Sequence, residues 1–160
     1  MRSDVFHPPD VCHPPLSLED DLGFLIARTH RAMRGYLVHR LGSLGATFEQ
    51  YQVLMSLSEG DHIPQHVLAE RMSLEPSSMT RMLHRMEKSG LVTRIEDETD
   101  SRVRLVVLTS EGRGLLEPLA AIRDECFDEV LQDLREAEGV EELKRLLNLV
   151  FLRASKTAQD

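Results

Sequence analysis

Two adjoining segments decide the fold: PQHVLAERMSLEPSSMTRMLHRMEKSG at residues 64–90 and LVTRIEDETDSRVRLVVLT at residues 91–109. In the first, apolar residues recur every three or four positions, and a proline opens each of two expected helices, 64–72 and 76–89. The second alternates apolar and polar residues on both sides of the polar turn EDETDS. This pattern predicts a β-hairpin over 91–108.

The flanking sequence predicts longer helices with broad apolar stripes. Upstream, apolar residues recur at helical spacing over 18–42, and Thr47 begins a capping box for a further helix. Downstream, Thr109 is a suitable N-cap for a long helix, and a last helix is expected over 139–155. Residues 1–17 contain four prolines and no helical period, so a flexible tail is expected there.

Short helices followed by a hairpin are the order of elements in a winged helix-turn-helix domain, where the hairpin is the wing. We therefore expect a mainly α fold with a small β-hairpin, and the winged helix-turn-helix domain at 47–109. A dimerisation helix at 18–46 and C-terminal dimerisation helices at 110–160 would flank it. One small domain cannot cover the apolar stripes of these outer helices, so they should pack against a second copy of the chain.

The composition is that of a globular protein, with 41% hydrophobic and 29% charged side chains among 160 residues. The sequence has no apolar stretch of about 18 residues and no secretory signal, so a cytoplasmic protein without a membrane span is expected. The net charge is −8, from 19 Lys and Arg against 27 Asp and Glu, which taken alone argues against nucleic acid. DNA binding depends on the charge of one surface, however, so the distribution of the positive charge along the chain decides whether such binding is expected.

The expected helix 76–89 has two unlike faces. Its methionines and Leu83 gather on one side, and the opposite side is small-polar and basic: Ser77, Arg81, His84 and Lys88, with Thr80 on the flank. Such a set suits the major groove of DNA, since hydroxyls bond phosphates or base edges and Arg bonds guanine with both arms. An ordinary solvated face is the alternative. From 76 to 94 there are four Lys or Arg and one acid, which favours DNA binding in an acidic chain.

The turn of the hairpin carries both signs of charge. Arg102 is placed to enter a narrow minor groove, where the electrostatic potential is most negative. Asp100, two residues earlier, can bond the guanidinium and hold it in place. The remaining acids of the loop would repel phosphates, and a charged turn that keeps the hairpin soluble explains the same residues equally well.

These segments resemble the MarR family of bacterial transcriptional regulators. The resemblance rests on VLAERMSLEPSSMTRMLHRMEKSGLVTR, DETDSR and VVLTSEGR, and extends over residues 18–155. It implies a homodimer with two winged lobes that binds a pseudo-palindromic double-stranded DNA operator, usually as a repressor. Helix 76–89 would be the recognition helix, with contacts from Ser77, Ser78, Thr80, Arg81 and His84. The family's wing motif is an Asp and two basic residues; here Ser101 stands between Asp100 and Arg102, which removes one expected phosphate contact.

The same resemblance implies that a small aromatic acid or phenol releases many members of the family from DNA. In members that bind aromatic carboxylates, a basic residue of the first helix anchors the carboxylate, and Arg28 aligns best with it. The implied site is a crevice between the first helix, the second helix and the helix beginning near Ser110. Alternatively, Arg28, Arg31 and Arg34 face solvent or pair with acids across the dimer.

Peroxide-sensing members carry a reactive cysteine early in the first helix, and alignment on LGFLIA puts Gly23 at that position. Peroxide sensing by that mechanism is therefore not expected. A redox sensor that uses the tail thiol of Cys12, beside His13, stays open as an alternative. Cys126 lies on an apolar stripe and is expected to serve packing.

Two further classes of function compete with DNA binding. An enzyme is not expected, because the sequence lacks a nucleophile–base pair, a glycine-rich phosphate loop and a metal motif. No cofactor is expected, and His7, Asp10, Cys12 and His13 do not have the spacing of a known metal site. A winged-helix adaptor that binds protein is the other alternative, but it has no need of a basic helix face.

Overall fold

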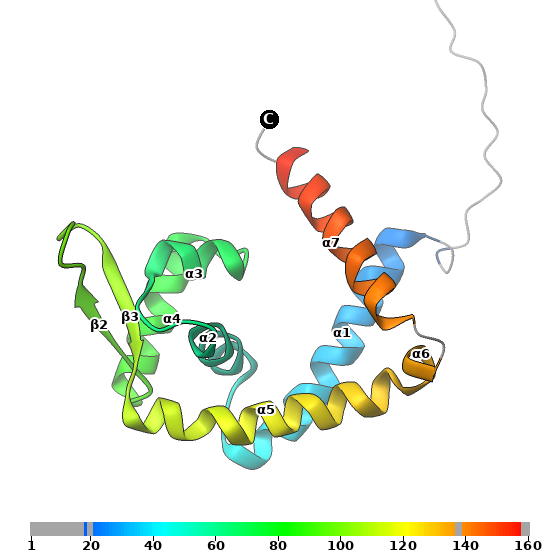
Figure 1. The fold of residues 1–160 in the computed structure, drawn as a ribbon, viewed down its shortest axis with the longest axis horizontal. Coiled ribbons are helices and arrows are strands. Elements are labelled where there is room, and N and C mark those ends of the chain that lie inside the picture. Colours follow the sequence, from blue (N-terminus) through cyan, green and yellow to red (C-terminus); the bar gives the residue numbers. More distant parts are fainter. Residues whose placement is uncertain (1–17, 19–20, 137–138, 158–160) are drawn as a thin grey trace, which may run out of the picture. The chain divides into compact units, whose positions relative to one another are not determined.

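The computed structural model describes residues 18, 21–136 and 139–157 of the chain, which divides into two compact units, 1–33 and 34–160 (Figure 1). The mainly helical fold with a small sheet is confirmed. None of the helices in the described part is long and apolar enough to cross a membrane. In chain order the elements are α1 Leu22–Leu41, the 3-10 helix η1 Gly42–Leu44, α2 Phe48–Ser58, β1 Ile63–Pro64, α3 Gln65–Arg71, α4 Pro76–Lys88, β2 Val92–Glu96, β3 Arg104–Leu108, α5 Ser110–Val130, α6 Gln132–Glu136 and α7 Val140–Thr157.

Two of the predicted helix starts are held by side-chain caps. The Thr47 hydroxyl accepts the N–H of Gln50 at 3.2 Å, and the Gln50 side-chain oxygen accepts the N–H of Thr47 at 2.8 Å. The Thr109 hydroxyl accepts the N–H of Gly112 at 3.0 Å at the start of α5. Both caps satisfy backbone donors that the first turn of a helix leaves unpaired, and both are as predicted.

Two predicted helix limits are wrong. The helix expected over 18–42 begins at Leu22, where the Asp21 carboxylate accepts the N–H of Phe24 at 2.6 Å and so caps its first turn. The long helix expected after Thr109 has an apolar stripe that continues to Leu134, but α5 ends at Val130, and Leu134 lies on the separate short helix α6. An apolar stripe continues across such a break, so periodicity alone does not reveal it.

The strand β1 was not expected from the sequence. Ile63 pairs with Val106 and Pro64 with Leu105, which gives an antiparallel three-stranded sheet of order β1-β3-β2. Pro64 is tolerated because β1 is an edge strand, whose outer side needs no N–H donor. A strand of two residues is too short to show an alternating pattern.

The core of the winged lobe lies between the sheet and helices α2 to α5. In Figure 1, α2 lies against α5, and α4 packs mainly on α3 and β2. The four side chains assigned to the inner face of α4 are all buried there: Met79, Met82, Leu83 and Met86. Their burial turns the opposite face of α4 toward solvent, because a helix with one apolar stripe can bury only that side.

The start of α5 is fastened to the turn that follows α4. The Thr109 N–H donates to the Leu91 carbonyl at 3.2 Å, and the Thr109 hydroxyl donates to the Gly90 carbonyl at 2.6 Å. The backbone comes so close here that a Cβ on Gly112 would lie 2.1 Å from the Leu91 carbonyl oxygen. Glycine is therefore required at this joint between the end of α4 and the beginning of α5.

Candidate nucleic-acid interface

The outward face of α4 presents the polar and basic side chains predicted to meet DNA. Ser77, Arg81, His84 and Lys88 are all exposed, on the side of the helix opposite to its buried methionines. Ser78 is half-buried and accepts a hydrogen bond from the Arg81 guanidinium at 3.4 Å. A rigid helix that holds four such groups on one side can present them together to the edges of successive base pairs.

The cations of this face are not neutralised by carboxylates. Within the part of the chain that the structure describes, no ion pair involves Arg81, Arg85 or Lys88. Arg85 lies one turn after Arg81, on the flank of the face, and was not among the contact residues expected from the sequence. Three free positive charges on 13 residues contrast with the net charge of −8 for the whole chain. This is the local concentration of charge that phosphate binding needs.

Thr80 has a structural task that the sequence did not reveal. Its hydroxyl donates to the Pro76 carbonyl at 2.9 Å and accepts from the Gln65 side-chain amide at 2.7 Å. Gln65 is the first residue of α3, so this bond ties the two helices of the helix-turn-helix together. Thr80 is exposed, but its hydroxyl proton is already engaged. Gln65 is a residue of the interface that sequence reasoning missed, because no local pattern links two positions 15 residues apart.

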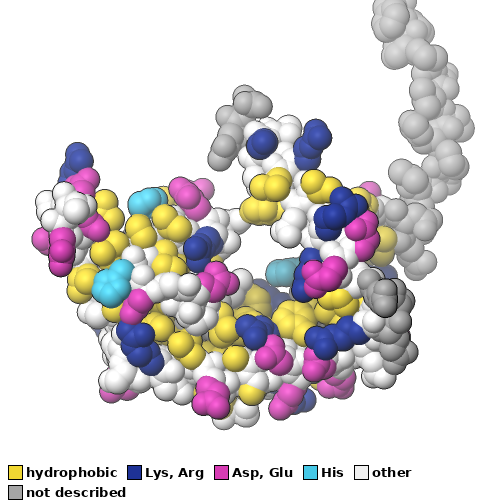
Figure 2. Space-filling model, viewed as in Figure 1, with side chains coloured by type: hydrophobic (Ala, Val, Ile, Leu, Met, Phe, Trp, Pro, Cys, Tyr) yellow, Lys and Arg dark blue, Asp and Glu magenta, His cyan; other side chains and the backbone are white. Residues whose placement is uncertain are grey.

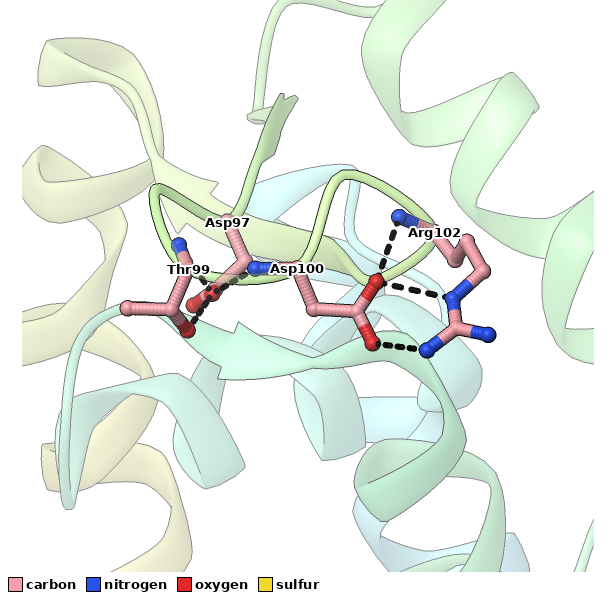
Figure 3. A network of polar contacts seen from close by, with 4 residues as sticks. All are labelled: Asp97, Thr99, Asp100 and Arg102. Carbon is pink, nitrogen blue, oxygen red and sulfur yellow. Dashed lines mark hydrogen bonds and ion pairs between the residues drawn. The ribbon is translucent and has the colours of Figure 1, made fainter.

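The tip of the wing is ordered around two aspartates (Figure 3). Asp100 accepts two bonds from the Arg102 guanidinium at 2.9 Å and one from its N–H at 3.0 Å. One oxygen of Asp97 accepts the hydroxyl of Thr99 at 2.5 Å and the N–H groups of Thr99 and Asp100 at 2.9 and 3.0 Å. The bond from Arg102 lowers the pKa of Asp100, and the bond from Thr99 lowers the pKa of Asp97. The expected contact between Asp100 and Arg102 is present, and 89% of the Arg102 side chain is exposed.

The other arginines of the wing are paired. Arg94 bonds Glu87 and Arg104 bonds Glu96, each at 2.5 Å. The one acid among residues 76–94, Glu87, is therefore the partner of Arg94, which leaves the other three cations of that segment unpaired among the described residues. Acidic side chains gather around the wing, at the left of Figure 2. Two of its three arginines are thus held by carboxylates of α4 or the neighbouring strand, whereas Arg102 is held by Asp100 of its own turn and stays 89% exposed.

The comparisons with known proteins agree with this geometry. The sequence profile of the MarR family matches residues 47–103, which run from α2 to the wing. The organic hydroperoxide resistance transcriptional regulator of Bacillus subtilis (strain 168) is 35% identical over 102 residues, or 64% of this chain and 69% of that protein. The chain belongs to the MarR family of transcriptional regulators. Such proteins are winged-helix DNA-binding regulators and not enzymes.

Two solved structures of regulators with similar sequences have the same fold. CouR from Rhodococcus jostii RHA1, bound to p-coumaroyl-CoA, is 28% identical with a TM-score of 0.76, over 84% of this chain and 94% of that one. Wild-type MarR from E. coli, in its apo form, is 30% identical with a TM-score of 0.68, over 81% and 96% of the two chains. The likeness thus extends well beyond the segment that the family profile matches.

The arginines of the first helix differ in their surroundings. Arg28 belongs to the N-terminal unit, where its guanidinium stands 6.0 Å from the centre of the Phe24 ring. Arg34 belongs to the second unit, where it lies 5.0 Å from the Phe48 ring centre and pairs with Glu49 at 2.9 Å. Within its own chain, Arg34 thus has an acidic partner on α2.

The thiols of this MarR-family protein give no reactive site in the described residues. Cys126 is buried in the core, and burial raises the pKa of its thiol, which disfavours the nucleophilic thiolate. Packing was the role expected for it. Cys12 lies outside the described residues, as do His7, Asp10 and His13. Within residues 21–136 and 139–157, no three His, Cys, Asp or Glu side chains stand together as a metal site.

Proposed function

We propose that the protein is a homodimeric repressor that binds a pseudo-palindromic operator. Helix α4 enters the major groove and the wing enters the adjacent minor groove. The observation that carries this proposal is the exposed face of α4, where Arg81, Arg85 and Lys88 lack carboxylate partners among the described residues while most other arginines have one. Free cations gathered on one helix of an acidic chain favour a polyanion as the partner.

The surface of α7 supports a dimer. None of its described residues is buried, and it exposes a run of large apolar side chains by 43–54% each: Leu146, Leu147, Leu149, Val150, Phe151 and Leu152 (Figure 2). An apolar surface of this extent marks an interaction site. A second copy is the partner that gives a regulator two recognition helices related by a two-fold axis, as a palindromic operator requires.

Two measurements on one sample test the two parts of the proposal, the dimer and the operator. Light scattering at micromolar concentration should return twice the 18.2 kDa of one chain. Selection from a random duplex library by the same sample should recover two-fold symmetric sites, with half-sites about one helical turn apart. A mass of one chain would contradict the dimer. Recovery of no DNA would favour the winged-helix adaptor instead.

The wing should read a narrow minor groove. Arg102→Ala is expected to weaken binding by about tenfold on operators with A·T-rich steps under the wing, and less on G·C-rich ones, because narrow grooves focus negative potential on a guanidinium. Asp100→Ala should cause a smaller loss of the same kind, since the free Arg102 keeps its charge but loses its orientation. Fluorescence anisotropy on both operators measures this. Tighter binding by Asp100→Ala would mean that Asp100 only repels phosphates.

We propose further that a small aromatic acid or phenol releases the protein from DNA, with Arg28 as the anchor of a carboxylate. The p-coumaroyl-CoA bound to CouR supports an aromatic effector for this fold. A ligand can shift binding only by its differential affinity for the two states of the dimer. Titration of salicylate-like acids against the operator complex should release wild type and Arg31→Ala, but not Arg28→Ala. Equal release of all three would exclude Arg28.

The name of the Bacillus relative favours a second candidate signal, an organic hydroperoxide. Cys126 is unsuited to it because it is buried, which leaves Cys12 as the thiol of such a sensor. Release of the operator by cumene hydroperoxide, abolished by Cys12→Ser and not by Cys126→Ser, would establish this function. Release by aromatic acids alone would exclude it.

A further inference from the structure

An ion pair joins the recognition helix α4 to the wing. Glu87 is in the last turn of α4, and Arg94 is the third residue of β2. The Glu87 carboxylate accepts the Arg94 guanidinium at 2.5 Å with one oxygen and the Arg94 N–H at 3.0 Å with the other. Both bonds reach the same residue of the wing, so they constrain its backbone as well as its side chain.

This pair is the least exposed ion pair of the described residues. The side chains of Arg94 and Glu87 are 22% and 26% exposed, whereas one or both members of every other described pair are more open to solvent. The bond from Arg94 lowers the pKa of Glu87, so the carboxylate stays charged at neutral pH. A partly buried, doubly bonded pair is more rigid than a single contact between exposed side chains.

The pair stands where the wing leaves the lobe. Val92 and its cross-strand neighbour Leu108 are buried at the base of the hairpin, whereas Ile95 and Glu96 on the far side of Arg94 are exposed. A hollow of about 320 Å³ lies beside the pair, lined by Glu87, Arg94 and Arg104. On β3 the buried Val106 and its neighbour Leu105 are held by pairing with β1, whereas on β2 the Glu87–Arg94 pair is the side-chain contact that fastens the strand to α4.

We propose that Glu87 and Arg94 are positioning residues that set the angle between α4 and the wing. They let Arg81 in the major groove and Arg102 in the minor groove engage the operator together. Because the wing is held before binding, less conformational freedom is lost when Arg102 enters its groove. This inference rests on the proposed function.

A purely electrostatic role of Glu87 predicts the opposite effect. An acid close to the DNA would repel phosphates, so its neutralisation would tighten binding and free the charge of Arg94. A positioning role predicts that neutralisation weakens binding to the operator, and that the loss falls on the contact made by the wing. The sign of the change therefore separates the two roles.

A double-mutant cycle tests the positioning role. The operator affinities of wild type, Glu87→Gln, Arg102→Ala and the double variant are measured by fluorescence anisotropy at one salt concentration. We expect Glu87→Gln to weaken binding about threefold or more, and the further loss on Arg102→Ala to shrink from about tenfold to less than threefold. The loss caused by Arg81→Ala should stay the same in the Glu87→Gln background.

Glu59→Gln is the matched control. It removes the same charge from the same lobe, and its partner Arg71 lies on α3, with a pair distance of 3.4 Å and both side chains exposed. The full effect of Arg102→Ala should persist in this background. Tighter binding by Glu87→Gln, or additive effects with Arg102→Ala, would overturn the positioning role. Equal weakening of the Arg81 and Arg102 contacts would show a general loss of structure and overturn it too.

The cycle also separates this inference from the proposed function. If wild type binds no operator, the proposed function fails and the positioning role fails with it. If wild type binds and the cycle is additive, only the positioning role fails.

Discussion

Gly112→Ala is expected to destabilise the winged lobe by about 3 kcal/mol or more, at the upper end of what overpacking usually costs. The added Cβ would lie 2.1 Å from the Leu91 carbonyl oxygen and 3.3 Å from the Leu108 side chain. The Leu91 backbone cannot move aside as the end of a flexible side chain can. The helix α5 must therefore shift away from the turn that follows α4. For a chain of this size, the loss corresponds to a fall in Tm of roughly 10 °C.

Gly114→Ala is the matched control for this prediction. It lies in the same turn of α5, and a Cβ there meets nothing within 4 Å. Since alanine is favoured over glycine in a helix by about 1 kcal/mol, this variant should be as stable as wild type or more so. Thermal and urea unfolding at one protein concentration compare the three chains, because a dimer's stability depends on concentration. Equal stability of the two variants would show that the contact with Leu91 relaxes freely.

The displacement of α5 caused by Gly112→Ala should also weaken DNA binding. The Thr109 bonds to the carbonyls of Gly90 and Leu91 are made beside Gly112, so a shift of α5 strains the link to the end of α4. In a dimer, the helices outside the lobe set the separation of the two recognition helices. If α5 no longer packs correctly against the turn after α4, α4 would therefore be misplaced even where the lobe remains folded.

Features that depend on neighbours in the sequence were predictable. The capping box of Thr47, the two faces of α4 and the bond from Arg102 to Asp100 all join residues within one or two helical turns or one loop. Local geometry alone places such groups, because the helical period and the length of a turn fix which side chains meet.

Features that join distant residues were not predictable. Glu87 and Arg94 are separated by the end of a helix and the turn into the wing, and Arg113 bonds Asp61 from 52 residues away. The sequence shows these residues only as charges, so a count of charges does not tell that Glu87 neutralises Arg94. Tertiary packing decides which charges are neutralised, and with them which cations remain for DNA. The contacts with DNA themselves stay predictions.

Arg81→Ala should cost about 1–3 kcal/mol per half-site, which is about 5- to 150-fold, and the dimer would lose this twice. Arg81 stands on the exposed face of α4, where the Ser78 hydroxyl is its one hydrogen-bond partner among the described residues, so most of its donors are free for a guanine. A bidentate contact carries sequence information. Its loss should therefore relax the preference at one base position of each half-site, as measured by binding to a panel of single-base operator variants.

Lys88→Ala is the matched variant on the same face, because it removes one positive charge from the last turn of α4. A lysine ammonium contacts phosphate without reading a base, so binding to every operator variant should weaken alike and the salt dependence should become shallower by about one counterion per half-site. The two variants thus separate base reading from charge. Arg81→Ala with an unchanged base preference and a shallower salt dependence would remove Arg81 from the residues that read the sequence and place it with Lys88.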